Sequence, residues 1–169
     1  MEYAKALEIA ERAHAALAPY CHRLSIAGSI RRQRPQVKDL ELVAMPLQEP
    51  SDLFGETLVA HHDFCAVVNQ WRAIKGQPTG KYTQRRLPQG INLDLFIADA
   101  DNWGWQLALR TGSTDYSHHV LATGLKKAGY AMLDGYIYRG GTRVPVREEA
   151  EIFALAQVPY AEPWAREIK

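Results

Sequence analysis

The sequence predicts an α+β fold, in which a mixed sheet with helices over residues 1–110 is followed by a smaller α+β lobe over residues 111–169. Stretches with apolar residues at every second position are typical of half-buried strands, and they lie between Ala- and Glu-rich stretches of high helix propensity. Thr111-Gly112-Ser113 interrupts this pattern, and we expect the second lobe to begin there.

Propensity, alternation and turn residues predict the elements of the first part. Tyr3–Leu17 is rich in Ala and Glu and is followed by Pro19, which predicts a helix that ends there. The other expected elements are strands over residues 22–27, 38–45, 81–87 and 91–98, helical or mixed segments over 51–60 and 63–72, turns over 76–80 and 88–90, and a helix over 103–109.

The second lobe shows helix and hairpin patterns. Residues 116–127 predict a helix, with Gly129 just past its end. Asp134-Gly135 between two short apolar runs predicts a hairpin over residues 130–139. A last helix is expected over residues 148–157, because acidic residues in its first turn complement the helix dipole.

Composition excludes several classes of protein. With 47% hydrophobic residues among 169 and a net charge of +1, the chain is not disordered, and it is long enough to bury roughly two-thirds of its unfolded surface. No apolar run approaches the roughly 18 to 20 residues of a membrane span, and acidic residues near the start argue against a signal peptide. Cys21 and Cys65 are too few for a disulfide scaffold, which favours a cytoplasmic protein.

Basic residues are concentrated in two stretches that contain no acidic residue, residues 12–38 and residues 64–93. Segregated positive charge attracts polyanions, although an ordinary solvated surface is the alternative. Arg85 and Arg86 are adjacent on an expected strand, so only one of them can face a polyanion.

Three acidic residues form the strongest candidate site. Asp39 and Glu41 lie two positions apart on the strand expected over residues 38–45, so both project from one face. Asp94 holds a matching position on the strand expected over residues 91–98. If these strands are neighbours, the carboxylates repel one another unless a cation is present, and oxygen ligands of this kind suit Mg²⁺. The alternative is that the acids are the solvated face of amphipathic strands.

Residues 28–32, Gly-Ser-Ile-Arg-Arg, lie between an expected strand and this acidic strand. Gly28 permits close backbone approach, the Ser29 hydroxyl can hold phosphate oxygens, and arginine adds charge-assisted hydrogen bonds. A phosphate-binding turn about ten residues before metal-binding carboxylates is what nucleotidyl transfer requires, because the triphosphate must be held and its α-phosphorus presented to a nucleophile.

These motifs resemble those of the polymerase-beta nucleotidyltransferase superfamily, and within it most closely the family X DNA polymerases. The deciding stretches lie downstream and are similar to that family's nucleotide-selecting C-terminal subdomain: Leu109 to Ser113, Tyr116, Gly129-Tyr130, Ile152-Phe153 and the run Tyr-Ala-Glu-Pro-Trp-Ala-Arg-Glu at residues 160–167. The resemblance covers most of residues 22–167. It implies a nucleotidyltransferase palm over residues 1–110 and a thumb or fingers subdomain over residues 111–169.

The resemblance also implies roles for individual residues. Asp39, Glu41 and Asp94 would bind two Mg²⁺ ions, with Mn²⁺ as a substitute, and Asp94 would accept the proton of a primer 3′-hydroxyl. The residues expected to contact the nucleotide are Gly28, Ser29, Arg32, Thr111, Gly112 and Tyr116. The residues expected to contact DNA are Arg72, Lys75, Lys81, Arg85, Arg86 and His118.

The implied activity is template-directed DNA synthesis, in which dNMP from a dNTP is added to a primer 3′-hydroxyl with release of pyrophosphate, in short-gap repair. The implied partners are gapped primer–template DNA and dNTP, without a membrane, and the expected state is a monomer.

The sequence departs from the family pattern in two respects. Glu41 occupies a position where the family usually has Asp, and only about twenty residues precede the first palm strand, so we expect a minimal form that lacks the N-terminal lyase domain.

Alternative functions remain open from the sequence. One is nucleotidyl transfer to a different acceptor, such as an RNA end, a protein or a small molecule, and another is DNA binding without catalysis. A zinc site built from Cys21-His22, His61-His62 and Cys65 is disfavoured, because the spacing of these residues matches no known ligand pattern.

Overall fold

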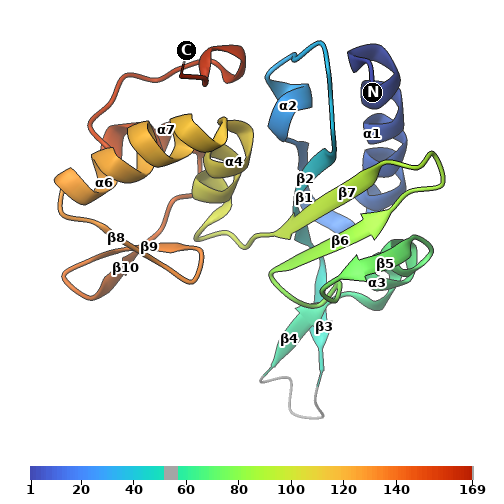
Figure 1. Ribbon diagram of the computed structural model, residues 1–169. Coiled ribbons are helices and arrows are strands. Elements are labelled where there is room, and N and C mark those ends of the chain that lie inside the picture. The colour runs from blue at the N-terminus through green and yellow to red at the C-terminus, as the bar shows by residue number, and fades with distance from the viewer. Residues whose placement is uncertain (52–56, 169) are drawn as a thin grey trace. The chain divides into compact units, whose positions relative to one another are not determined.

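The computed structural model describes residues 1–51 and 57–168, and these residues form a mixed α+β structure, as predicted. They pack as two compact units (Figure 1), one made of residues 1–26 and 35–98, the other of residues 27–34 and the chain from Asp99 onward. These units are defined by packing. The division into functional domains at residue 110 stays a prediction.

The first unit is built on a five-stranded mixed sheet. Its strands, in spatial order, are β1 (Cys21–Ile26), β2 (Leu40–Pro46), β7 (Asn92–Ile97), β6 (Tyr82–Arg86) and β5 (Arg72–Lys75). β2 and β7 run parallel, and the other neighbours are antiparallel. The four strands expected from alternation are confirmed, and β5, at the edge, was not predicted.

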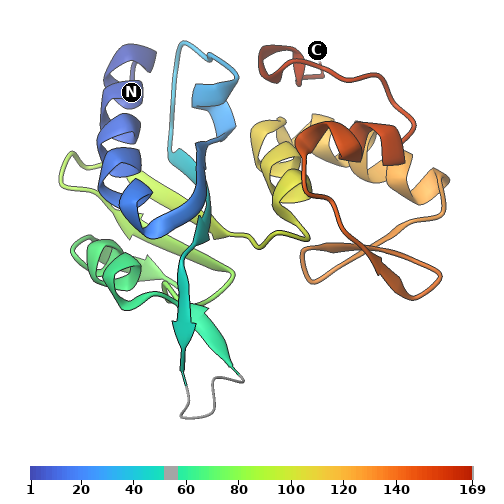
Figure 2. The ribbon, with the colours of Figure 1, turned by 180° about the vertical axis from the view of Figure 1, so that it is seen from behind.

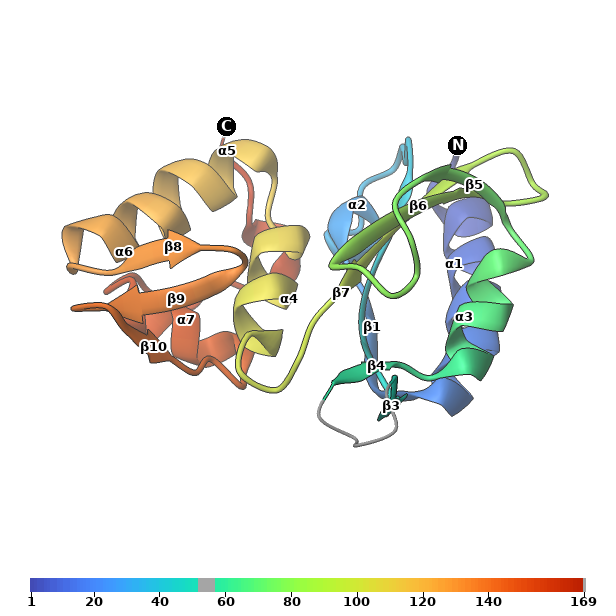
Figure 3. The ribbon, with the colours of Figure 1, turned by 90° about the horizontal axis from the view of Figure 1, so that it is seen from below.

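Two helices pack in the first unit, α1 (Tyr3–Leu17) and α3 (His62–Asn69), and Figures 2 and 3 show them on the same side of the sheet. α1 has the bounds predicted, and a short 3₁₀ turn at Ala18–Tyr20 carries Pro19. The buried face of α1 contacts β1, β2 and α3, where Phe64 is fully buried. Leucines of β2 and β7 complete this core, which fixes the two central strands.

A small hairpin extends the chain between β2 and α3. It pairs β3 (Gln48–Pro50) with β4 (Leu58–Ala60) in antiparallel register. In the helical or mixed segment expected over residues 51–60, residues 58–60 form a strand, and residues 52–56 lie outside the described residues. In the helical or mixed segment expected over residues 63–72, the helix ends at Asn69, and Arg72 already belongs to β5.

The second unit combines helices with a three-stranded meander. Its helices are α2 (Gly28–Arg31), α4 (Trp103–Thr111), α5 (Thr114–Tyr116), a π-helical stretch at Ser117–Ala122, α6 (Thr123–Lys127), α7 (Glu149–Leu155) and a 3₁₀ turn at Pro163–Ala165. Its strands are β8 (Ala131–Leu133), β9 (Tyr136–Arg139) and β10 (Thr142–Val144).

Both turns of the meander have the backbone that tight hairpins require. Asp134 and Gly135 have φ of 53° and 87°, and Gly140 and Gly141 have φ of 56° and 80°. Positive φ at both central residues is the signature of a type I′ turn. The first hairpin was predicted, whereas β10 was not, although Gly-Gly is itself a hairpin signal.

The core of the second unit lies between α4, α6, α7 and the meander. Leu121, Leu125, Ile137, Ile152 and Phe153 are all buried there. Within the described ranges, no helix is both long enough and apolar enough to cross a membrane.

Gly104 allows α4 to approach the chain before α7. A Cβ built on this residue would lie 2.3 Å from the Glu148 carbonyl oxygen, and the Gly104 N–H donates to the Val146 carbonyl in the same stretch. Because the atoms that a Cβ would meet belong to backbone, neither side can yield without moving an element. The packing of α4 against the chain before α7 therefore requires glycine at position 104.

We expect Gly104→Ala to lower the free energy of unfolding by about 1–3 kcal/mol, the usual cost of overpacking. Urea denaturation followed by tryptophan fluorescence measures the change, since Trp103 and Trp105 lie on α4. Gly80→Ala is the control, because its Cβ would meet nothing closer than 3.4 Å. Equal stability of the two variants would contradict the close approach.

Candidate functional site

The sheet of the first unit brings two of the predicted acids together. Glu41 on β2 and Asp94 on β7 are register partners in the parallel pair. Neighbouring strands lie about 4.8 Å apart, so these two residues occupy adjacent positions. The leucines on either side of Glu41, Leu40 and Leu42 in β2, are fully buried, which leaves the acids on the opposite face of the sheet.

Asp39 departs slightly from its prediction. It was expected within a strand over residues 38–45, but β2 begins at Leu40, so Asp39 lies in the bend just before the strand. It still belongs to the acidic group. Burial and then the negative charge of Asp94 raise the pKa of Asp39.

Asp94 is held by two side chains that were not among the predicted site residues. The Tyr82 hydroxyl donates to its Oδ1 at 2.6 Å, and the Gln84 amide nitrogen donates to the same oxygen at 2.8 Å. Both lie on β6, where Gln84 is the register partner of Asp94. Their spacing of two residues on a neighbouring strand is the signal in the sequence that could have found them.

The acidic group fits Mg²⁺ by its chemistry, because it offers carboxylate oxygens whose mutual repulsion a cation would relieve. The side chains of Glu41 and Asp94 are partly buried. In the described part of the chain the three acids are not gathered as closely as Glu49, His61 and His62, whose ligand atoms all lie within 4.8 Å of one another. The candidate site therefore rests on the register of β2 and β7, which places Glu41 beside Asp94, and not on a closely packed set of ligand atoms.

The predicted phosphate-binding residues form α2, in the second unit. Gly28 has φ of 62°, a conformation that favours glycine. The Ser29 hydroxyl oxygen is buried and has no hydrogen-bond partner among the residues described. An unsatisfied buried hydroxyl is costly, so this group is available to a ligand oxygen.

The arginines of α2 and its C-terminal end are bound by protein groups. Arg32 donates to the Thr111 carbonyl at 2.7 Å and to Glu167 at 2.9 Å. Arg31 donates to the Thr111 hydroxyl at 2.7 Å and forms a two-pronged pair with Glu149 at 2.6 and 2.9 Å. Both arginines therefore converge on the end of α4, where the nucleotide-contacting Thr111 was predicted.

Glu149 is the buried centre of this arrangement. It receives Arg31 and also Arg166, whose side chain is fully buried and lies 4.8 Å from the centroid of the Phe153 ring. Burial alone would raise the pKa of Glu149, but hydrogen bonds from Arg166 and then Arg31 outweigh burial and lower that pKa. No local sequence pattern predicts this network, because its members are 17 and 118 residues apart.

The residues after Thr111 are closely packed. A Cβ on Gly112 would lie 2.6 Å from the Ser117 hydroxyl and 3.1 Å from the Tyr116 ring. Glycine at this position therefore allows Tyr116 and Ser117 to pack closely against the backbone of residue 112. Ser113 caps α5 by accepting from the Tyr116 N–H. Tyr116 is buried and His118 is exposed, so of these two only His118 lies open to solvent.

One predicted DNA-binding residue requires correction. Arg85 is 1% exposed and donates to the Gly76 carbonyl and the Asn69 side chain, so it supports the loop beside β6 instead of facing DNA. The four other basic residues predicted to contact DNA from this stretch are exposed: Arg72, Lys75, Lys81 and Arg86. Arg72 and Arg86 are register partners at the β5 edge of the sheet.

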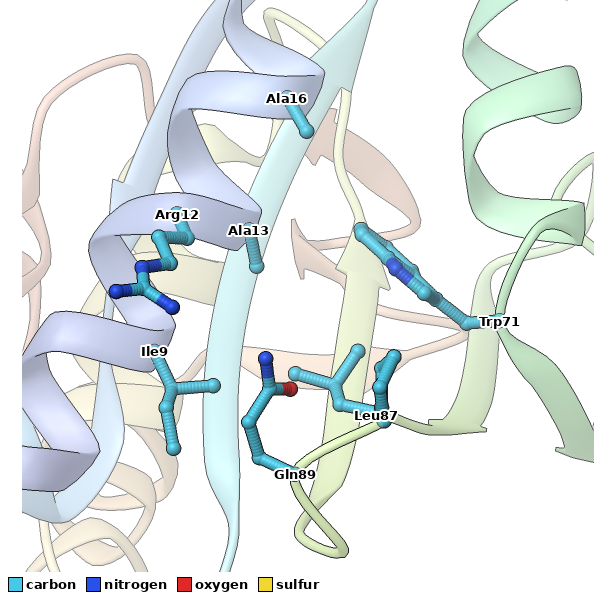
Figure 4. Close-up of a pocket in the computed structure, with 8 residues that line it drawn as sticks. Ile9, Arg12, Ala13, Ala16, Trp71, Leu87 and Gln89 are labelled. Atoms are coloured by element: carbon cyan, nitrogen blue, oxygen red, sulfur yellow. The ribbon is translucent and has the colours of Figure 1, made fainter.

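The structure contains pockets of about 150 Å³ in the first unit and about 360 Å³ in the second. The first lies between Ile9, Arg12 and Ala13 of α1 and the side chains of Trp71 and Leu87 (Figure 4). The second is lined by residues of the π-helical stretch, of α6 and of the chain after α7. Neither pocket is lined by a predicted site residue, so the candidate site is not formed by either of them.

Comparison with known proteins finds a family model that matches part of the chain. Residues 106–167 match the family model of the DNA polymerase beta thumb. A search of curated proteins finds no match for this chain. The matched range includes Thr111, Glu149 and Arg166 of the buried network, whereas Arg31 lies outside it.

We expect Glu149→Gln to reduce the free energy of unfolding by about 3–5 kcal/mol, because it leaves a buried arginine without its ion-pair partner. The wild-type contribution of Glu149 is present above its unfolded pKa, near 4.5, and is lost as the pH falls through its lower folded pKa. Unfolding curves at pH 7 and in the acid range should show this loss for the wild type and not for the variant. Glu162→Gln, at an exposed position, is the control, and an equal effect there would argue against the network.

Proposed function

We propose that the chain, whose residues 106–167 match the DNA polymerase beta thumb, is a family X, polymerase-beta-like protein. In this proposal it is a template-directed DNA polymerase that adds dNMP from dNTP to a primer 3′-hydroxyl and fills short gaps in DNA. The proposal is supported above all by the occurrence, in one chain, of this thumb and of a register-paired Glu41 and Asp94 on a parallel strand pair. The match to the thumb model rests on family likeness alone. The pairing of Glu41 with Asp94 rests on the geometry of the sheet.

We assign Asp39, Glu41 and Asp94 as the ligands of two Mg²⁺ ions. When bound, these ions would neutralise phosphate charge and lower the pKa of the attacking hydroxyl. The acids offer oxygen donors on one face of the sheet, and the interaction between Asp39 and Asp94 is the repulsion that cations relieve. Glu41 is one methylene longer than the usual Asp, which makes it the ligand most sensitive to metal spacing.

Asp94 is also our candidate for the group that accepts the 3′-hydroxyl proton. Its Oδ1 accepts hydrogen bonds from Tyr82 and Gln84, which leaves Oδ2 as the oxygen for ligand or proton. The two donors fix the orientation of the carboxylate, so they act as positioning residues. In the reaction, the 3′-oxygen attacks the α-phosphorus, the bond to the bridging oxygen breaks, and pyrophosphate leaves.

We assign the triphosphate to α2 in the second unit. The unpartnered Ser29 hydroxyl and the tight turn at Gly28 are suited to phosphate oxygens. Arg32 is engaged by Thr111 and Glu167. A triphosphate that takes this guanidinium must therefore compete with Glu167, and we propose that this exchange couples nucleotide binding to the end of α4.

We expect Asp94→Asn to reduce primer extension on gapped DNA with Mg²⁺ and four dNTPs by about 10²-fold or more, the range for loss of a general base. DNA affinity should stay within about twofold of wild type, because the change only removes negative charge. Glu11→Gln on the exposed side of α1 is the control. Retained extension by Asp94→Asn would contradict the assignment, and wild-type transfer to an RNA end without extension of DNA would favour the other acceptor class.

Removal of the exposed basic residues should weaken DNA binding in a salt-dependent way. The fourfold variant Arg72→Ala, Lys75→Ala, Lys81→Ala and Arg86→Ala should reduce the slope of log affinity against log salt by up to about 0.9 for each phosphate that is no longer neutralised. The slope is measured by fluorescence anisotropy with gapped DNA. Lys5→Ala is the control at an exposed position of α1. An unchanged slope would assign DNA to another surface.

A further inference from the structure

A histidine and carboxylate cluster lies apart from the acids of β2 and β7 in sequence. Glu49 belongs to β3, His61 follows β4, and His62 begins α3. Each of the three offers a ligand atom within 4.8 Å of the other two. All three lie in the first unit.

We propose that Glu49, His61 and His62 bind one Zn²⁺ ion, with a fourth position left to water. Two imidazoles and one carboxylate form a donor set that Zn²⁺ takes in proteins. Nothing in this proposal depends on the polymerase function.

The distances within the cluster match a tetrahedral ion. Zn–N and Zn–O bonds of about 2.0–2.1 Å place neighbouring ligand atoms about 3.3 Å apart. His62 Nδ1 lies 2.8 Å and His61 Nε2 lies 3.6 Å from the same oxygen of Glu49, Oε2. The observed distances lie on either side of the required one, so side-chain shifts of about half an ångström suffice.

The second nitrogen of each imidazole faces another carboxylate. Asp63 Oδ1 lies 3.4 Å from His62 Nε2, and Asp63 Oδ2 lies 3.7 Å from His61 Nδ1. Metal-bound histidines usually donate their other ring N–H to such an acceptor, which fixes the tautomer. With His61 Nδ1 protonated, its weak contact with the Asp63 N–H, at 3.3 Å, would be replaced by the Asp63 carboxylate.

Backbone structure already fixes the three ligands. Glu49 pairs with Val59 in the β3–β4 hairpin, and its Oε1 accepts from the His62 N–H at 2.9 Å. The His61 N–H donates to the Leu47 carbonyl, and the His61 carbonyl accepts from the Cys65 N–H in the first turn of α3. An ion held here would tie the hairpin to α3.

Cys65 lies near the cluster but is not one of its ligands. Its thiol donates to the Ala60 carbonyl at 3.6 Å, and it does not join the close group formed by Glu49, His61 and His62. The zinc site disfavoured from the sequence included both cysteines and did not include Glu49. A hairpin separates Glu49 from His61 along the chain, so no local spacing pattern connects these two residues.

Zinc titration of the untagged full chain, dialysed against a chelator, tests the proposal. Isothermal titration with Zn²⁺ should give one bound ion. The double variant His61→Ala and His62→Ala should bind at least about tenfold more weakly, and Glu49→Gln and Asp63→Asn should each weaken binding. The chain supplies a matched control in its other adjacent histidine pair, so His118→Ala with His119→Ala should bind as the wild type does.

Two further measurements make the outcome decisive. Co²⁺ in place of Zn²⁺ should give a tetrahedral absorption spectrum without a thiolate band, and Cys65→Ala should leave that spectrum unchanged. Excess Mg²⁺ should not displace Zn²⁺. Any one of three results would overturn the site: unchanged Zn²⁺ affinity in the His61 and His62 variant, loss of binding in the His118 and His119 variant, or displacement of Zn²⁺ by Mg²⁺.

Circular dichroism of each variant distinguishes loss of ligands from loss of fold. Substitution of the exposed His62 alone is the mildest change.

Discussion

The parallel pairing of β2 with β7 is the constraint on which the candidate site depends. In a parallel pair, each residue lies beside its register partner on the neighbouring strand. The register of β2 and β7 therefore places Glu41 beside Asp94. The antiparallel neighbour β6 then presents Tyr82 and Gln84 to Asp94 on the same face. A shift of one residue in β7 would send Asp94 into the leucine core, so burial of those leucines protects the arrangement of the acids.

The second unit is organised differently, around a buried charge. Glu149 is matched by two guanidinium groups, and one of them, Arg166, has a further nitrogen, Nη2, without a hydrogen-bond partner in the described chain. Such a network adds little net stability compared with apolar packing, but removing one partner is costly. It therefore serves mainly to hold α2, the end of α4 and the stretch around Arg166 in one arrangement.

Local patterns predicted much of this structure, and the failures have physical reasons. The bounds of α1, the central strands and the Asp134-Gly135 turn follow from propensity and period. β5 was missed because all four of its residues are exposed and its register shifts, which leaves no alternation to detect. Alternation also showed that Arg85 and Arg86 face opposite ways, but only the packed sheet decides that Arg85 is the buried one. Contacts such as Arg31 with Glu149 have no local signal at all.

The place of α2 in the chain has a consequence for dissecting the molecule. Residues 27–34 precede β2 in sequence but pack with the chain from Asp99 onward. A fragment cut at Asp99 would thus retain the whole matched thumb range yet lose Arg31 and Arg32, and with them the guanidinium partners of Thr111. The matched range is therefore not a self-contained unit of packing. A fragment that keeps these contacts would require a graft of that short helical segment, or a circular permutation that joins it to the C-terminal half.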